Sequence, residues 1–136
     1  MNKLLNVKKP VLLSTLWIFV MFNMLFADIL SFIAPGFFEE IGEMADILTE
    51  PTLLMFAVLL EIPIAMILLS RVLGENALRR AHLVAVPITI LFVVGGGSTS
   101  LHYFFFAGME ILAMLIALYV AWGASTEAVT AEVALN

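Results

Sequence analysis

The hydrophobic pattern of the chain consists of four long apolar stretches separated by short polar segments. Each stretch has about the 20 residues that a helix needs to cross the hydrocarbon core of a bilayer, at a rise of about 1.5 Å per residue. The pattern therefore predicts an all-α fold, a four-transmembrane-helix bundle in a single membrane domain with a short polar tail. The expected helices lie at about 11–33, 52–70, 77–97 and 101–122, and the tail at 123–136.

The segment between the first two long stretches, at about 37–49, has a different pattern. Phe37 and Ile41 fall on one face of a helix, whereas Glu39 and Glu43 fall on another. This spacing indicates an amphipathic helix that is too short and too charged to cross a membrane. We expect it to lie at the membrane surface; the alternative is a solvated connector.

The composition supports a membrane protein. Hydrophobic residues make up 63% of the 136 residues and charged residues only 12%, whereas soluble domains have roughly 45–50% and 25%. A soluble domain of this size has no interior large enough to bury so much apolar surface. The chain has no cysteine, which excludes disulfides and thiolate metal sites. We expect the lipid bilayer as its surroundings and no nucleic-acid partner.

The basic residues predict the orientation of the helices. Three lie before the first helix and three between the second and third apolar spans, where Arg79 and Arg80 fall in the first turn of the third helix. Four spanning helices place both regions on one side. The positive-inside rule makes that side cytoplasmic, together with both termini. The acidic segment and the glycine-rich turn before the fourth helix then face outward. The basic residues are Lys3, Lys8, Lys9, Arg71, Arg79 and Arg80.

Three carboxylic acids lie inside expected spans. Glu110 and Glu61 are each ~14–15 Å from the outer helix ends and Asp28 is ~7 Å deep, with Asn23 at ~15 Å. A charged side chain at such depth costs a few kcal/mol even on the gentlest scale, so it is usually paired, protonated or functional. The plainer alternative is that these acids pair with polar neighbours only to fix helix packing.

Two further polar residues extend this set toward the outer surface. Tyr103 lies seven residues before Glu110 on the same helical face, and His102 lies beside it at the start of the helix. The cytoplasmic half offers no comparable series. We therefore expect a polar cavity that faces outward and is closed toward the cytoplasmic side. The candidate ligand- or proton-binding residues are Glu61, Glu110, Asp28, Tyr103, His102 and Asn23.

Two chemistries suit such a cavity. Two nearby carboxyl groups in a low dielectric repel each other when both ionise, so one is expected to hold a proton and to support acid/base work or proton transfer. Glu61, Glu110 and His102, with Asp28, also form a weak candidate set of ligands for a divalent cation. No metal-binding motif supports this second chemistry, and the sequence identifies no cofactor.

A row of small residues follows Glu110 along its helix, at Ala113, Ala117 and Ala121. Small residues four apart allow a neighbouring helix to approach closely. Glu61 has alanines four residues before and after it, so we expect close contact between the second and fourth spanning helices. Four short helices bury little surface among themselves, and we therefore expect a homo-oligomer with the alanine seam as one possible interface.

Three segments carry a resemblance to known proteins: LSTLWIFVMFNMLFADILSF, LLEIPIAMILLSRVL and GGGSTSLHYFFFAGMEI. Over roughly Leu13 to Trp122 the chain resembles a family of small bacterial four-helix membrane proteins without an established activity. In size and helix number it is more loosely similar to the DoxX-like membrane proteins, some of which are linked to quinone or redox functions. The closer resemblance implies a location in the bacterial inner membrane and provides no catalytic residues.

The sequence leaves three functions open. The first is a cavity, entered from outside, that binds or transforms a small lipophilic or cationic ligand at Glu61 and Glu110. The second is proton- or cation-coupled transport or channel activity by a homo-oligomer. The third is a non-catalytic membrane partner subunit whose acids only fix packing. Whether the protein is an enzyme stays open at this stage.

Overall fold

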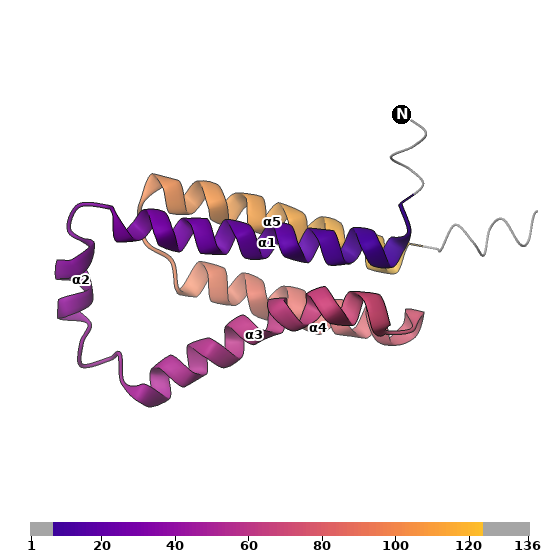
Figure 1. Cartoon of the computed structure of the whole chain (residues 1–136), viewed down its shortest axis with the longest axis horizontal. Coiled ribbons are helices and arrows are strands. Elements are labelled where there is room, and N and C mark those ends of the chain that lie inside the picture. The colour runs from indigo at the N-terminus through magenta and orange to yellow at the C-terminus, as the bar shows by residue number, and fades with distance from the viewer. Residues whose placement is uncertain (1–6, 124–136) are drawn as a thin grey trace, which may run out of the picture.

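The computed structural model of the chain describes residues 7–123, in which the regular elements are all helices (Figure 1). Four of these helices are long and apolar enough to cross a membrane. The expected all-α architecture with four spanning helices is thereby confirmed, and the expected tail lies outside the described residues except for Gly123. The elements are α1 (Lys9–Phe32), α2 (Phe37–Glu43), α3 (Glu50–Val72), α4 (Glu75–Gly95) and α5 (Leu101–Trp122).

Local sequence explains where the long helices begin and end. Pro10 and Pro51 each occupy the second position of a helix, where the missing N–H has no partner to lose. Gly74 separates α3 from α4, and each of these helices starts two residues earlier than expected. The boundaries of α5 match the expected ones.

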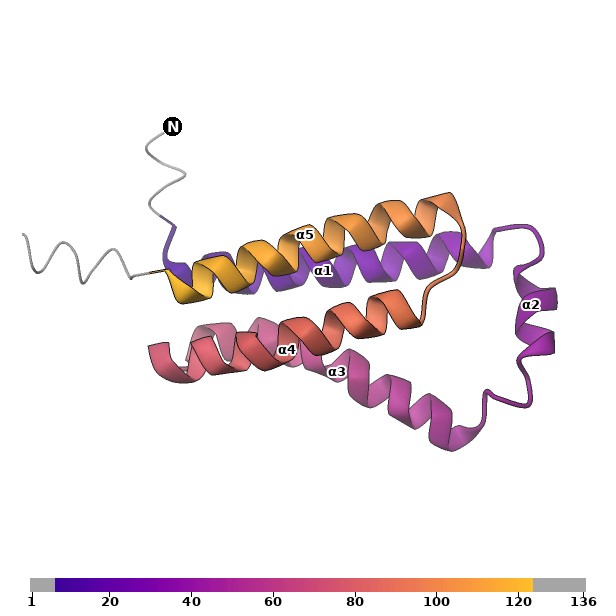
Figure 2. The ribbon, with the colours of Figure 1, turned by 180° about the vertical axis from the view of Figure 1, so that it is seen from behind.

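The four long helices form a ring in which α1 contacts α5 and α3, while α4 also contacts α5 and α3 (Figure 2). The helices that face each other across the ring, α3 and α5, make no close backbone contact. The expected contact between the second and fourth spanning helices is therefore wrong. The two helices do not meet because α1 already covers the small-residue face of α5.

The alanine seam of α5 is part of the interior. Ala113, Ala117 and Ala121 are all buried, with exposed fractions of 4%, 1% and 0%. The lower part of this seam packs in one cluster with Leu13 of α1 and Leu78 of α4. The small side chains therefore bring α1 and α5 together within one chain, and the seam is not a free surface for a second copy.

The segment before α3 is less regular than expected. The amphipathic helix α2 has only seven residues and none of them is buried; the chain from Met44 to Leu48 continues in turns. A helix this short is marginal without packing partners, and α2 lies at the end of the bundle, with only slight contact to α1. The expected helix over 37–49 is therefore confirmed only in its first half.

The first half of α3 diverges from the other spanning helices (Figures 1 and 2). The buried residues of α3 are Pro63, Met66 and Ser70, all in its second half. Pro63 removes the hydrogen bond that the carbonyl of Leu59 would accept in a regular helix, which favours a bend there. The divergence leaves a groove between α3 and α4 that is bounded by α2.

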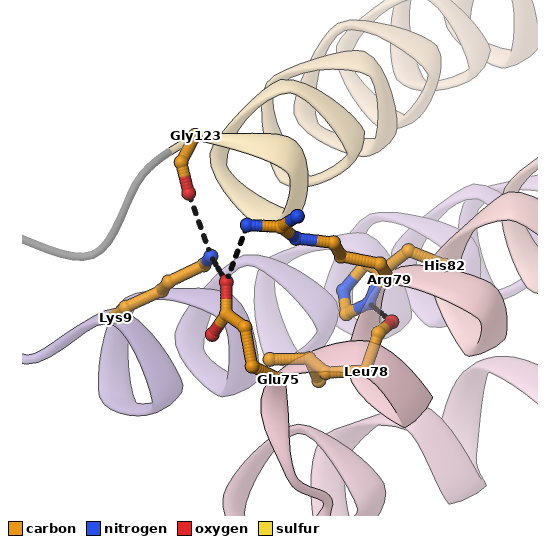
Figure 3. A network of polar contacts seen from close by, with 6 residues as sticks. All are labelled: Lys9, Glu75, Leu78, Arg79, His82 and Gly123. Carbon is orange, nitrogen blue, oxygen red and sulfur yellow. Dashed lines mark hydrogen bonds and ion pairs between the residues drawn. The ribbon is translucent and has the colours of Figure 1, made fainter. Parts of the chain in front are cut away.

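At the opposite end, an ion-pair network ties three helices together (Figure 3). The Lys9 ammonium pairs with the Glu75 carboxylate and donates a 2.9 Å hydrogen bond to the Gly123 carbonyl. Arg79 donates to the same carboxylate at 3.1 Å. We call this the basic end of the bundle, and the end that carries α2 and the 96–100 turn the acidic end. The basic end is closed by these contacts.

Candidate intramembrane polar pocket

The central polar group of the bundle is the carboxyl group of Glu110, in the middle of α5. Its side chain is 2% exposed, and no hydrogen bond or ion pair joins it to any other residue between 7 and 123. It lines a cavity of about 100 Å³, large enough for a few waters or one small headgroup. A carboxyl group held in such a place without a protein partner is costly unless the space it faces supplies one, and the space that Glu110 faces is this cavity.

All four spanning helices contribute to this cavity, which we call the polar pocket. Its polar side chains come from α1 and α5, and its apolar wall comes from α1, α3 and α4. Because the residues are far apart in the sequence, the pocket exists only when the ring of helices is closed. Its lining residues are Met24, Ala27, Asp28, Leu60, Phe92, Val93, Gly96, Tyr103 and Glu110.

Tyr103 is fixed at the acidic end of the pocket by one contact with the last turn of α4 and one with the turn that follows it. Its hydroxyl donates a 2.8 Å hydrogen bond to the carbonyl of Val93, one of the last-turn carbonyls that a helix leaves unpaired. Its ring lies against Gly97, where an added Cβ would be only 2.6 Å from the Tyr103 Cε1 atom. A side chain at position 97 would push the Tyr103 ring away, so this position requires glycine.

Asp28 forms the outer rim of the pocket. It is exposed but still lines the cavity that Glu110 also lines. The lining of the pocket contains two carboxyl groups and one phenol, and it includes no basic side chain. A lining that contains acids and no base favours a cation over an anion.

Below Glu110 the bundle is tightly packed. Ala113 and Met114 follow it on α5 with exposed fractions of 4% and 0%, and Trp17 and Val86 fill the space from α1 and α4. The described part of the chain thus has a pocket that extends from the acidic end to Glu110 and is closed by side chains toward the basic end.

Two of the predicted site residues lie near the pocket but do not line it. Asn23 is buried one turn below Ala27 and donates a 2.7 Å hydrogen bond to the Phe19 carbonyl of its own helix. His102 contacts the Ser31 hydroxyl of α1 at 3.2 Å. Since that hydroxyl already donates to the Ala27 carbonyl, the histidine is the donor, and it ties α5 to α1 at the acidic end.

Glu61 is separate from the pocket. It is exposed on the outer surface of α3 and does not line either of the two cavities described here. Within residues 7–123 no group of three histidine or acidic side chains lies close enough together to hold a metal ion. The structure therefore does not bring Glu61 and His102 to Glu110, as joint acid/base work or metal binding would require.

Sequence reasoning missed a buried polar pair in the lower half of the bundle. The Trp17 indole donates a 3.1 Å hydrogen bond to Nε2 of His82, and Nδ1 of the same ring contacts the Leu78 carbonyl at 2.9 Å. Both side chains are 0% exposed. The available signal was that His82, Thr89 and buried apolar residues recur at helical spacing along α4. This pair is fully satisfied and packs the two diagonal helices α1 and α4 together.

The chain belongs to a family of unknown function, DUF6326, whose model matches residues 4–131. This agrees with the resemblance to a family without an established activity, whereas the looser resemblance to DoxX-like proteins is not shown. No curated protein and no solved structure matches the chain.

Proposed function

We propose that this protein is a multi-pass protein of the bacterial inner membrane whose polar pocket binds a small cation, such as ammonium or a short primary amine. The observation that carries the proposal is the Glu110 carboxyl group, which is 2% exposed, lacks a partner within residues 7–123 and lines a cavity. An ammonium group entering that cavity would supply the missing charge and hydrogen-bond donors.

The polar groups of the pocket have distinct roles in this proposal. Glu110 is the anchor that accepts charge-assisted hydrogen bonds from the ammonium group. Asp28 at the rim attracts the cation, and the bound cation reduces the repulsion between the two nearby acids. Tyr103 already donates its proton to Val93, so its oxygen offers lone pairs to a donor in the pocket.

The packing below Glu110 favours binding over transport in a single chain. Trp17, Met114 and Val86 are all nearly or fully buried beneath the pocket, and a cation that crosses to the basic end would have to displace them. The pocket opens at the acidic end, which the distribution of basic residues predicts to be the outer side. In this proposal the protein therefore captures a cation from outside the cell.

The proposal is tested by measuring the binding of radiolabelled ethylammonium to protein in lipid nanodiscs. Glu110→Gln is expected to weaken binding about tenfold or more, because charge-assisted hydrogen bonds contribute ~1.5–3 kcal/mol. Glu61→Gln is the matched control, since it makes the same change in the middle of another span but outside the pocket.

Three outcomes are informative. A loss confined to Glu110→Gln supports the polar pocket. Equal affinities in the wild type and both variants contradict it. If ethylammonium does not bind to the wild type and Glu110→Gln changes only the thermal stability, the acid has a packing role and the protein is better described as a partner subunit.

A further inference from the structure

The polar pocket is adjacent to a second and much larger cavity between α2, α3 and α4. This groove has a volume of about 680 Å³, and its lining is mainly apolar, which is the size and character typical of sites for lipophilic ligands. It exists because the first half of α3 diverges from α4. Its walls include Phe56 and Leu59 of α3 and Leu91 of α4, and Ile41 of α2 lies at its end.

The groove and the polar pocket share part of their lining. Phe92 and Gly96, at the end of α4, belong to both. Neighbouring residues of α3 also divide between the two cavities, because Leu60 lines the pocket and Leu59 lines the groove. Phe92 and Gly96 therefore lie where the two cavities adjoin. The Phe92 ring lies 6.2 Å from that of Phe56.

We infer that the groove holds the hydrocarbon part of the ligand whose ammonium group binds at Glu110, so that the ligand class is an amphiphilic primary amine. This inference rests on the proposed function. The polar pocket, at about 100 Å³, accommodates a headgroup but not a chain, whereas the groove is large and apolar. An amine with an alkyl chain matches both cavities at once and passes between them beside Phe92 and Gly96.

The two cavities contribute differently to recognition. A lipid-facing groove offers little hydrophobic driving force, because the surrounding lipid tails are as apolar as the groove itself. The buried acid therefore supplies most of the affinity and discriminates amines from neutral lipids of similar length, whereas the groove accommodates the chain.

The chain provides a well-matched pair of variants for this inference. Gly95 lines the groove and a Cβ added there meets no atom within 4 Å, so the Cβ of Gly95→Leu has room and its side chain takes up space in the groove. Gly108 is also an unobstructed glycine within a spanning helix, but it lines neither cavity. Gly108→Leu is therefore the control for adding a leucine to a helix, and Leu91→Trp is a second way to fill the groove.

The experiment uses decylammonium carrying a photoreactive diazirine midway along its chain, with the full-length protein in nanodiscs and peptide mapping by mass spectrometry. We expect labelling of Phe56, Leu59 and Leu91, at least fivefold lower in Gly95→Leu and Leu91→Trp and unchanged in Gly108→Leu. Glu110→Gln is expected to reduce the labelling similarly, and decanol with the same diazirine to label the groove weakly.

Failure of this inference is distinguishable from failure of the proposed function. Ethylammonium that binds to wild type and to Gly95→Leu, with decylammonium labelling spread over all lipid-facing helices, overturns the inference and leaves the cation pocket standing. Labelling of the groove that persists in Glu110→Gln also overturns it, because the chain would then bind without its headgroup. Absence of ethylammonium binding to the wild type overturns both.

Discussion

Replacing Gly97 by alanine tests how the acidic end of the polar pocket is held together. A Cβ at this position would lie 2.6 Å from Cε1 of Tyr103 and 3.3 Å from its Cδ1 and Cζ atoms, and the first of these distances is too short for two carbon atoms. The ring must therefore move, and its 2.8 Å hydrogen bond to the Val93 carbonyl is lost or weakened.

The expected cost of Gly97→Ala follows from these two effects. Loss of one hydrogen bond costs about 1 kcal/mol, and accommodating an extra methyl group in a packed site costs ~1–3 kcal/mol. We therefore expect destabilisation by about 2–4 kcal/mol. Backbone strain adds nothing to this cost, because Gly97 does not have a positive φ; among the described residues the glycine with a positive φ is Gly36.

The measurement is unfolding of the purified protein in mixed micelles as the SDS fraction rises, followed by helical circular dichroism. Gly95→Ala is the control two residues away, where the new Cβ meets nothing within 4 Å, and it should be neutral or stabilising by up to about 1 kcal/mol. Tyr103→Phe isolates the hydrogen bond. Equal stabilities of Gly97→Ala and Gly95→Ala would refute the reasoning.

Three further predictions concern packing and topology. Trp17→Phe should destabilise the bundle by ~1–3 kcal/mol in the same unfolding assay, because it leaves a buried acceptor on His82 unpaired. Ala117→Leu should cost about 1–3 kcal/mol or more, since a 1% exposed seam residue has no room for a larger side chain. Because the chain has no cysteine, single cysteines can report orientation: Glu39→Cys should react with an impermeant maleimide on intact cells, and Asn76→Cys only after the cells are opened.

The number of spanning helices and their approximate bounds were predictable from the sequence because lipid imposes a length and an apolar composition on each span. Glu110, Tyr103 and Asp28 were also identifiable as one group, since depth and helical spacing place them near each other. The structure brings these three residues to a single cavity.

The lateral arrangement of the helices was not predictable in the same way. Alanines on the faces of α3 and α5 indicate close approach but do not say which helix approaches, and α1 is the neighbour of the α5 seam. As a result Glu61, at a depth similar to that of Glu110, lies on the outside of the ring. Pro63 is a sequence signal for a bend in α3. Hydropathy, however, does not distinguish a helix that packs along its whole length from one that diverges, so the groove beside α3 was not predictable.

The most direct test of the cation pocket is the distance between the bound cation and Glu110. Solid-state NMR dipolar recoupling between ¹⁵N-ethylammonium and protein carrying ¹³C-labelled glutamate carboxyl carbons measures it in lipid. We predict one strongly dephased carboxyl signal, which corresponds to an N⁺···O⁻ separation of about 2.8 Å. This signal should disappear in Glu110→Gln and persist in Glu61→Gln. Dephasing that persists in Glu110→Gln, or bound ethylammonium that dephases no glutamate carboxyl, would contradict the account.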